Sequence, residues 1–211
     1  MIPSEDEMYR SLAERHGIEF QKKVSSARVA VCGIGGLGSD IAIALARAGV
    51  GHIHIIDFDR VDISNLNRQQ YFVEQLGMYK TDALKETLSH VAPYCKITAD
   101  CVRIDEKNIP ELLKDCDIIC EAFDNAESKA VLVNSVLENF SEKYIVSGSG
   151  MVGIDSANTI KTRRVMNKLY ICGDGESDID DGKGLYPSRV MVCAGHQAHM
   201  ILRIISEKYD V

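Results

Sequence analysis

The sequence lacks any C-x-x-C cysteine pair, although it contains seven cysteines. Structural zinc sites usually take their ligands from closely spaced Cys or His pairs, so we expect no structural zinc. The cysteine count is odd, and several cysteines lie in apolar runs typical of core strands. Because a free thiol behaves as a small hydrophobe, this distribution indicates buried free thiols in a reducing compartment.

Long apolar runs and basic clusters are also missing. No apolar stretch approaches the roughly 20 residues that span a bilayer, and the acidic, polar start MIPSEDEMYRSLAER is unlike a signal peptide. We therefore expect a cytoplasmic protein without a membrane partner. The formal net charge is −7 and no Lys/Arg cluster stands out, which argues against nucleic acid as a partner.

The chain of 211 residues is long enough for one domain with a continuous core, and it shows neither repeats nor a linker. We expect a single domain over 1–211, with an N-terminal helical segment at 1–26. Strand-like and helical segments alternate as far as Gly150, which predicts a Rossmann-like, doubly wound α/β fold with a mostly parallel sheet. The predicted strands are 28–32, 52–56, 96–102, 117–120 and 144–147, then two short antiparallel edge strands at 157–164 and 168–171. The predicted helices are 4–16, one from the glycine turn to about Gly49, 80–91, 109–113, 128–139 and a C-terminal helix at 187–208, after a flexible crossover loop at 172–186.

A glycine-rich turn, GIGGLGS, stands between the first strand and the next helix. It contains the G-x-G-x-x-G spacing at Gly33, Gly35 and Gly38, with Gly36 inside it. This spacing lets the backbone approach a phosphate, while the following helix directs its free N–H groups and positive dipole end toward it. The context of strand, turn and helix therefore predicts a nucleotide site.

Two acids follow the second strand. Asp57 ends that strand, at the distance beyond the glycine turn where an acid holds ribose hydroxyls in nucleotide-binding folds. Asp59 lies two residues further on and is the second candidate, although it also fits a solvated loop acid. We favour Asp57 as the ribose ligand because it terminates the strand.

The next loop carries the run SNLNRQQ at 64–70. It places Asn65, Asn67, Arg68 and Gln69 near the carboxyl edge of the sheet, where open α/β sheets bind their ligands. An arginine there is able to clamp phosphates and to stabilise charge that develops during phosphoryl chemistry. The loop therefore favours reaction at phosphate over hydride transfer.

Three further polar residues fall at the same edge. Lys80 begins a helix from which its ammonium is able to reach a triphosphate, and Asp124 and Asn125 follow the strand at 117–120. A carboxylate in this position suits magnesium, which binds through one or two carboxylates together with substrate phosphates. Asp124 is therefore the predicted magnesium ligand, with capping of the next helix as its structural alternative.

Together these segments resemble the ThiF/MoeB/HesA family, relatives of the ubiquitin-activating enzymes. The resemblance is carried by GIGGLGS, GVGHIHIIDFDRVDISNLNRQQ, the lysine at Lys80 and EAFDNAESK, in that order. Within the family, the short length and segments such as SANTIKTR and YICGDGESD are most similar to the compact ThiF proteins associated with thiamine biosynthesis.

The resemblance implies an ATP- and magnesium-dependent adenylyltransferase. Such proteins adenylate the C-terminal glycine carboxylate of a small ubiquitin-like sulfur carrier, here a ThiS-like protein ending in Gly-Gly, and release pyrophosphate. It also implies a homodimer in which an N-terminal arginine, Arg10 or Arg15 in this chain, reaches the neighbouring site. The implied roles are nucleotide contact for Gly36, ribose for Asp57, phosphates for Asn65, Arg68, Gln69 and Lys80, and magnesium for Asp124.

The sequence leaves the acceptor open. Some relatives link the carrier to a cysteine in the crossover loop, but DIDDGKGLYP has none, and Cys172 and Cys193 only flank it at some distance. A MoaD-like carrier or a small carboxylate is an alternative substrate, because the motifs relate to the nucleotide alone. An NAD-binding oxidoreductase or redox-sensing module explains the glycine turn and Asp57 but not the cations. A non-catalytic, carrier-binding scaffold has no need of that polar set.

Overall fold

The computed structural model describes residues 2–178 and 181–211 and has a Rossmann-like α/β fold. One seven-stranded sheet has the order β3-β2-β1-β4-β5-β7-β6, in which every neighbouring pair is parallel except β6 and β7. The strands are β1 (Arg28–Cys32), β2 (His52–Asp57), β3 (Lys96–Cys101), β4 (Ile118–Glu121), β5 (Tyr144–Gly148), β6 (Lys161–Met166) and β7 (Leu169–Gly173). The predicted fold class, including the antiparallel edge pair, is confirmed.

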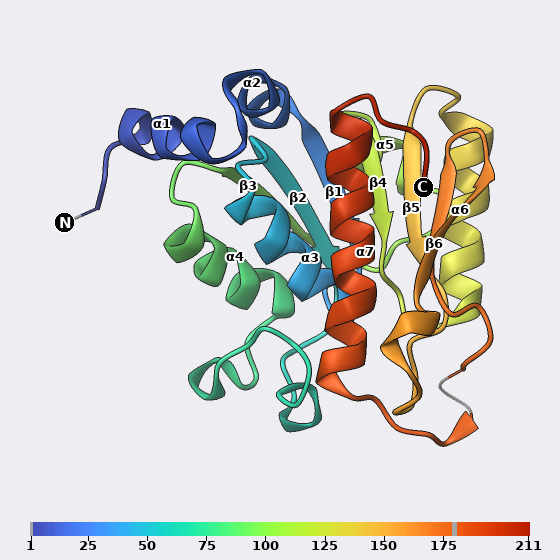
Figure 1. Ribbon diagram of the computed structural model, residues 1–211. Coiled ribbons are helices and arrows are strands. Elements are labelled where there is room, and N and C mark those ends of the chain that lie inside the picture. The colour runs from blue at the N-terminus through green and yellow to red at the C-terminus, as the bar shows by residue number, and fades with distance from the viewer. Residues whose placement is uncertain (1, 179–180) are drawn as a thin grey trace.

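Helices cover both faces of the sheet (Figure 1). Helices α3, α4 and α7 pack on one face, and α5 and α6 pack on the other. The α-helices are α1 (Glu5–His16), α2 (Ile18–Ser26), α3 (Gly36–Arg47), α4 (Lys80–Val91), α5 (Ile109–Leu113), α6 (Ala126–Asn139) and α7 (Pro187–Ile205), with short 3-10 turns at Ile63–Asn65, Val73–Gln75 and Ala157–Thr159.

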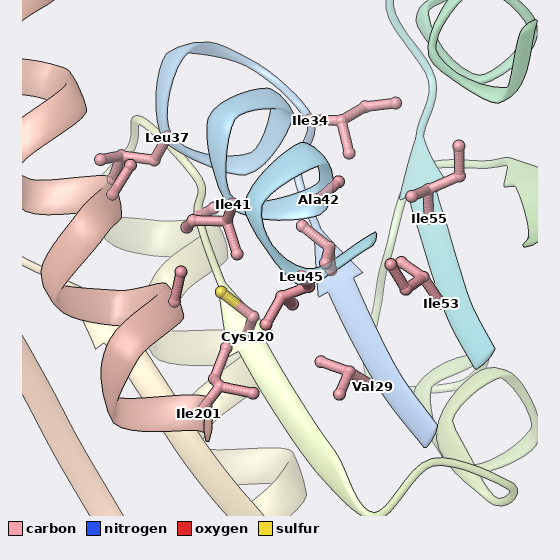
Figure 2. Packing of buried hydrophobic residues seen from close by; sticks show 14 of the residues in the cluster. Val29, Ile34, Leu37, Ile41, Ala42, Leu45, Ile53, Ile55, Cys120 and Ile201 are labelled. Atoms are coloured by element: carbon pink, nitrogen blue, oxygen red, sulfur yellow. The ribbon is translucent and has the colours of Figure 1, made fainter. Parts of the chain in front are cut away.

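The alternation of side chains along β1 and β2 divides the core in two. Val29 and Ile53 point to the face that carries α3, whereas Ala30 and Ile56 join the cluster beneath α5 and α6. Successive strand residues point to opposite faces, so a strand buried on both faces is apolar throughout. Figure 2 shows the first cluster, in which α3 lays a row of apolar side chains over β1, β2 and β4.

The N-terminal segment contains two helices where the sequence predicts one. The predicted capping box is present: the Ser4 hydroxyl accepts from the Glu7 N–H, and the Glu7 carboxylate accepts from Ser4 N. Gly17, at φ 92°, ends α1 and precedes α2. This left-handed conformation favours glycine, and it turns the chain between the two helices.

In the C-terminal third, the predicted bounds of both edge strands and of the last helix differ from the structure. Ala157–Thr159 forms a 3-10 turn instead of opening a strand, because the Ser156 hydroxyl accepts from Asn158 N and caps it. Strand β7 continues to Gly173, so the crossover loop begins after that glycine. Helix α7 ends at Ile205, before Glu207 at φ 59°.

The topology places a crevice beside β1. The chain runs outward from β1 through β2 to β3 and then returns to β4 on the other side of β1. Open α/β sheets bind ligands outside the carboxyl ends of the strands at this kind of switch point. The loops at those ends gather at the bottom of Figure 1, opposite α1 and α2. Among residues 2–178 and 181–211, no helix has the length and apolar character needed to cross a membrane.

Candidate active site

A cleft of about 300 Å³ lies at the carboxyl edge of the sheet, beside the switch point. The glycine turn forms one wall, and the loops after β2, β4 and β5 form the others. The predicted site residues in its lining are Gly33, Gly35, Gly36, Asp57, Asp59, Arg68, Gln69, Lys80, Asp124 and Asn125. Gly38 and Asn65 stand outside the lining, and each has a structural role instead.

The glycines are needed for close packing as well as for ligand approach. Gly33 has φ 83°, and a Cβ there would lie 2.8 Å from Cδ1 of Phe123. A Cβ on Gly38 would lie 1.9 Å from the carbonyl oxygen of Gly33, so this glycine permits the turn to close on the helix. No side chain caps the N-terminus of α3 in the described residues, which leaves its first amide groups to a ligand.

Asp57 fastens the glycine turn with its own carboxylate. Its Oδ2 accepts from the backbone N–H of Ile34 at 2.8 Å, and its Oδ1 accepts from that of Asp59 at 2.9 Å. The side chain is buried but lines the cleft. Because a carboxylate oxygen has more than one acceptor site, Asp57 is able to hold the turn and still accept from a ribose hydroxyl.

Lys80 and Asp59 form an ion pair at the cleft wall. Lys80 Nζ lies 3.0 Å from Asp59 Oδ2, and the lysine is 6% exposed while the aspartate is half exposed. The backbone N–H of Lys80 also donates to Asp59 O at 2.9 Å. The pair brings an ammonium from the start of α4 to the cleft, and it gives Asp59 a partner instead of the free solvated position considered from the sequence.

Arg68 reaches the cleft from the SNLNRQQ loop. Its Nη1 donates to Ser64 O at 3.0 Å and to Asn67 Oδ1 at 2.8 Å, which leaves other guanidinium N–H groups for a ligand. Burial lowers the pKa of Arg68, and the negative charge of Asp124 opposes that shift. Arginine remains protonated throughout, so the cleft holds a fixed cation near an acid.

The predicted phosphate ligand Asn65 supports the loop from outside the cleft. Its Oδ1 accepts from Asp62 N at 3.0 Å, which caps the short 3-10 turn, and its carbonyl accepts from Gln69 N. Gln69, in contrast, is buried and lines the cleft, and its Oε1 has no hydrogen-bond partner in the described structure. An unpartnered buried acceptor is costly, so Gln69 is suited to bind a ligand.

The same loop is tied to the glycine turn at two points. The Tyr71 hydroxyl donates to Ile34 O at 2.6 Å, and the backbone N–H of Gln70 donates to the Ser39 hydroxyl at 3.1 Å. Gln70 Nε2 donates to Asp40 at 2.5 Å; burial raises the pKa of that acid and this bond opposes the rise. Arg68 and the glycine turn are therefore held in one rigid unit.

Asn125, and not Asp124, caps the helix that follows β4. Asn125 caps α6, because its Oδ1 accepts from Ser128 N at 2.8 Å. Asp124 is exposed and lines the same cleft as Arg68, close enough for its negative charge to act on the pKa of the guanidinium. Within residues 2–178 and 181–211, no group of three or more His, Cys, Asp or Glu side chains is arranged to hold a metal.

One buried ion pair in this region was not identified from the sequence. Glu121, the last residue of β4, is fully buried, and its Oε2 lies 2.6 Å from Lys129 Nζ. The same oxygen accepts from the Ser147 hydroxyl, and Lys129 also donates to Gly148 O at 2.6 Å. The available sequence clue was an acid at the end of the apolar run IIC, within the motif EAFDNAESK.

A second buried pair fastens the crossover loop. Arg189 Nη2 lies 2.7 Å from Asp174 Oδ2, and Nη1 donates to the carbonyls of Asp155 and Ser156. Burial alone would raise the pKa of Asp174, but the amide and hydroxyl of Ser177, other amide N–H groups and Arg189 hold it well below its ordinary value. No local spacing in the sequence reveals this pair.

The cleft lining also includes apolar side chains and the exposed Arg103. Phe58, Ile104 and Phe123 line the cleft, and the Arg103 guanidinium lies 5.6 Å from the centre of the Phe58 ring. Aromatic and guanidinium planes of this kind suit the stacking of a flat heterocycle. The cleft lining therefore combines apolar and cationic side chains, as a nucleotide requires.

The N-terminal arginines lie far from this cleft. Arg10 pairs with Asp6 at 2.5 Å on α1, and α1, which also carries Arg15, lies at the opposite end of the sheet (Figure 1).

All seven cysteines are free, and Cys172 and Cys193 are buried. Burial raises the pKa of Cys172 to about 11. Neither of these two thiols lines the cleft.

Comparisons with known proteins agree with this architecture. The adenylyltransferase and sulfurtransferase UBA4 of Eremothecium gossypii is 40% identical over 141 residues, which is 66% of this chain and 31% of the relative. The probable adenylyltransferase/sulfurtransferase MoeZ of Mycobacterium tuberculosis is 35% identical over 130 residues, 61% of this chain and 33% of the relative. The chain thus spans about a third of the length of these curated relatives.

A solved structure shares the fold along nearly the whole chain. Escherichia coli tRNA N6-threonylcarbamoyladenosine dehydratase, TcdA, in complex with ATP, has a TM-score of 0.87 at 20% identity, covering 99% of this chain and 98% of that one. The family model of the ThiF family matches residues 8–211. Since that match covers almost all of the sequence, the chain belongs to the ThiF family.

Proposed function

We propose that this chain is an ATP-dependent adenylyltransferase that activates the C-terminal glycine carboxylate of a ubiquitin-like sulfur carrier. The observation that carries the proposal is the meeting of a glycine turn with Arg68, Lys80 and Asp124 in one cleft. The curated relatives UBA4 and MoeZ are named adenylyltransferases, which supports the same class of reaction.

The cleft lining suits the different parts of ATP. Phe58 and Arg103 accommodate the base, and Asp57 accepts from the ribose. The glycine turn and the N-terminus of α3 receive the phosphates, together with Arg68 and Lys80. Gln69, whose buried Oε1 has no partner in the described structure, gains a hydrogen bond when a donor from the ligand enters.

Magnesium fits the donors that are present. It binds through one or two carboxylates together with phosphate oxygens and water, so the exposed Asp124 and the ATP phosphates form an adequate set. When bound there, the ion offsets phosphate charge. Arg68 lines the same cleft and holds the phosphates by its guanidinium.

The reaction needs no nucleophile from the protein. A carboxylate oxygen of the acceptor forms a bond to the α-phosphorus, the bond from that phosphorus to the bridging oxygen of the β-phosphate breaks, and pyrophosphate leaves with that electron pair. The acceptor carboxylate and the pyrophosphate both carry negative charge, which Arg68 and Lys80 stabilise. Positioning and electrostatics therefore supply the catalysis.

For the acceptor we propose a ThiS-like carrier ending in Gly-Gly, and for the assembly a homodimer. The first rests on the resemblance to compact ThiF proteins. The second is supported by the place of Arg10 and Arg15 on α1, at the end of the sheet opposite the cleft of the same chain. From there an arginine is able to serve only a neighbouring molecule's cleft.

Pyrophosphate exchange into ATP tests the proposal. Purified ThiS-like and MoaD-like carriers and a small carboxylate are compared as acceptors, with exchange expected for the ThiS-like protein. Arg68→Ala and Asp124→Ala are expected to lower exchange on the order of 10²–10³-fold. Arg60→Ala is the matched control, because Arg60 lies in the same loop region but donates to Gly77 O outside the cleft.

Each failure has a distinct meaning. Exchange with the MoaD-like carrier or the small carboxylate alone contradicts the ThiS-like acceptor and leaves adenylation standing. Full exchange in the Arg68 or Asp124 variant contradicts the roles given to those side chains. Tight binding of NAD without binding of ATP overturns the adenylyltransferase itself and favours an oxidoreductase or redox-sensing module.

A further inference from the structure

The Glu121–Lys129 pair joins three elements beneath the cleft. Glu121 ends β4, Lys129 lies on α6, and their charged atoms are 2.6 Å apart. The second donor bond of Lys129 goes to the carbonyl of Gly148, which ends β5, at 2.6 Å. One ammonium therefore holds the carboxyl ends of two neighbouring strands, with the glutamate fully buried and the lysine partly exposed in the cleft.

Both loops that this pair holds line the cleft. The Glu121 Oε1 accepts from the backbone N–H of Phe123 at 2.7 Å, which orients the turn at 122–125. Asp124 is the next residue in that turn. On the other side, Gly148 begins the stretch 148–152, all of which lines the cleft. The pair thus determines how the Asp124 turn lies relative to the opposite wall.

Stability alone gives little reason for such a pair. When two charges are buried, the free energy of their attraction barely offsets the free energy of hydration that they lose. Apolar residues of similar volume often stabilise a core as well or better. The carboxylate of Glu121 nevertheless uses both oxygens in hydrogen bonds to named groups: Phe123 N, the Ser147 hydroxyl and Lys129 Nζ. What the pair adds is a set of hydrogen bonds that fixes the orientation of the backbone at the carboxyl edge of the sheet.

We propose that Lys129 and Glu121 are positioning residues that place Asp124 for magnesium–ATP. In this role neither side chain contacts the reacting atoms. The inference rests on the proposed function, because it takes Asp124 as the magnesium ligand. Groups that orient a metal ligand matter nearly as much as the ligand, and their loss typically costs 10–100-fold in metal affinity.

The chain provides a matched control at the other end of the same strand. Lys143 is a buried lysine that, like Lys129, donates two hydrogen bonds, although both go to backbone carbonyls: to Lys114 O at 2.9 Å and to Cys116 O at 2.6 Å. It precedes β5, at the amino ends of the strands and away from the cleft. Lys143→Met therefore removes a comparable structural lysine without touching the Asp124 turn.

The experiment is calorimetric titration of the full chain with ATP, once with magnesium and once with EDTA. We compare the wild type, Lys129→Met, Lys143→Met and the double variant Glu121→Met/Lys129→Met, each with a thermal melt. The double variant removes both charges, so it avoids the uncompensated buried carboxylate of the single variant and is expected to melt at a higher temperature than that variant.

The expected result is a loss confined to the magnesium-dependent part of ATP affinity. In Lys129→Met and in the double variant, the factor by which magnesium raises ATP affinity should fall on the order of 10–100-fold, while the ATP affinity measured in EDTA stays near that of the wild type. For Lys143→Met, the ATP affinities with magnesium and with EDTA should both stay near those of the wild type. A double variant that keeps the full magnesium gain overturns the inference and leaves the proposed function intact. A wild type that binds no ATP overturns the proposed function. A wild type whose ATP affinity is indifferent to magnesium contradicts the role of Asp124, and the inference with it.

Discussion

Asp57→Asn tests whether one carboxylate both holds the glycine turn and serves the nucleotide. The substitution keeps one acceptor oxygen and turns the other into an NH₂ group, which faces a backbone N–H of either Ile34 or Asp59. A hydrogen bond to a charged group contributes about 1.5–3 kcal/mol. Asp57 is only 9% exposed, so solvent screens this loss little. We expect the free energy of unfolding to fall by about that amount.

The assay is urea unfolding together with a thermal melt and an ATP titration. For a domain of this size each kcal/mol shifts the melting temperature by about 2–4 °C, so a fall of about 3–12 °C is expected. ATP affinity should fall as well, because the glycine turn loses a hydrogen bond that fixes one of its amides and the ribose loses a hydrogen-bond acceptor. Asp62→Asn is the control, since Asp62 also accepts from a backbone N–H, that of Ser64, but is exposed. An Asp57→Asn protein that matches this control in stability and binds ATP as the wild type does would refute the reasoning.

Three further predictions concern Asp174 and the cysteines. The folded-state pKa of Asp174 lies below its ordinary value, so its contribution to stability is complete above about pH 4 and is lost as the pH falls toward the folded pKa. Asp174→Asn should therefore flatten the loss of unfolding free energy below pH 4 in urea titrations, and parallel curves would contradict the Asp174–Arg189 pair. Burial raises the pKa of Cys172 to about 11, whereas Cys101 is exposed, so iodoacetamide near neutral pH should alkylate Cys101 first by mass spectrometry. A Cys172→Ser/Cys193→Ser protein should still form acyl-adenylate, and loss of that reaction with a normal melt would contradict adenylation without a protein thiol.

Much of the fold was predictable because its signals are local. Alternating strands and helices predict a parallel sheet, and the apolar runs in β1 and β4 match strands buried on both faces. The separate helix α2 was missed because it depends on the left-handed turn at Gly17. The 3-10 turn at Ala157–Thr159 was missed because a single hydroxyl decides it, that of Ser156.

The candidate site was predictable to the extent that its residues follow strand ends. Asp57 ends a strand, and Arg68 and Asp124 lie in loops that follow strands; parallel strands bring those ends to one edge. What the sequence did not provide was the supporting contacts. Asn65 caps a turn outside the cleft, and the Glu121–Lys129 pair depends on how α6 packs on the sheet.

The most direct test of the central claim is intact mass spectrometry of a ThiS-like carrier after incubation with this protein, ATP and magnesium. We predict a carrier that gains one adenylyl group on its C-terminal carboxylate, with pyrophosphate released in equal amount. Arg68→Ala should abolish most of that gain, whereas Arg60→Ala should keep it. A carrier whose mass is unchanged by a wild-type protein that binds ATP would contradict the claim.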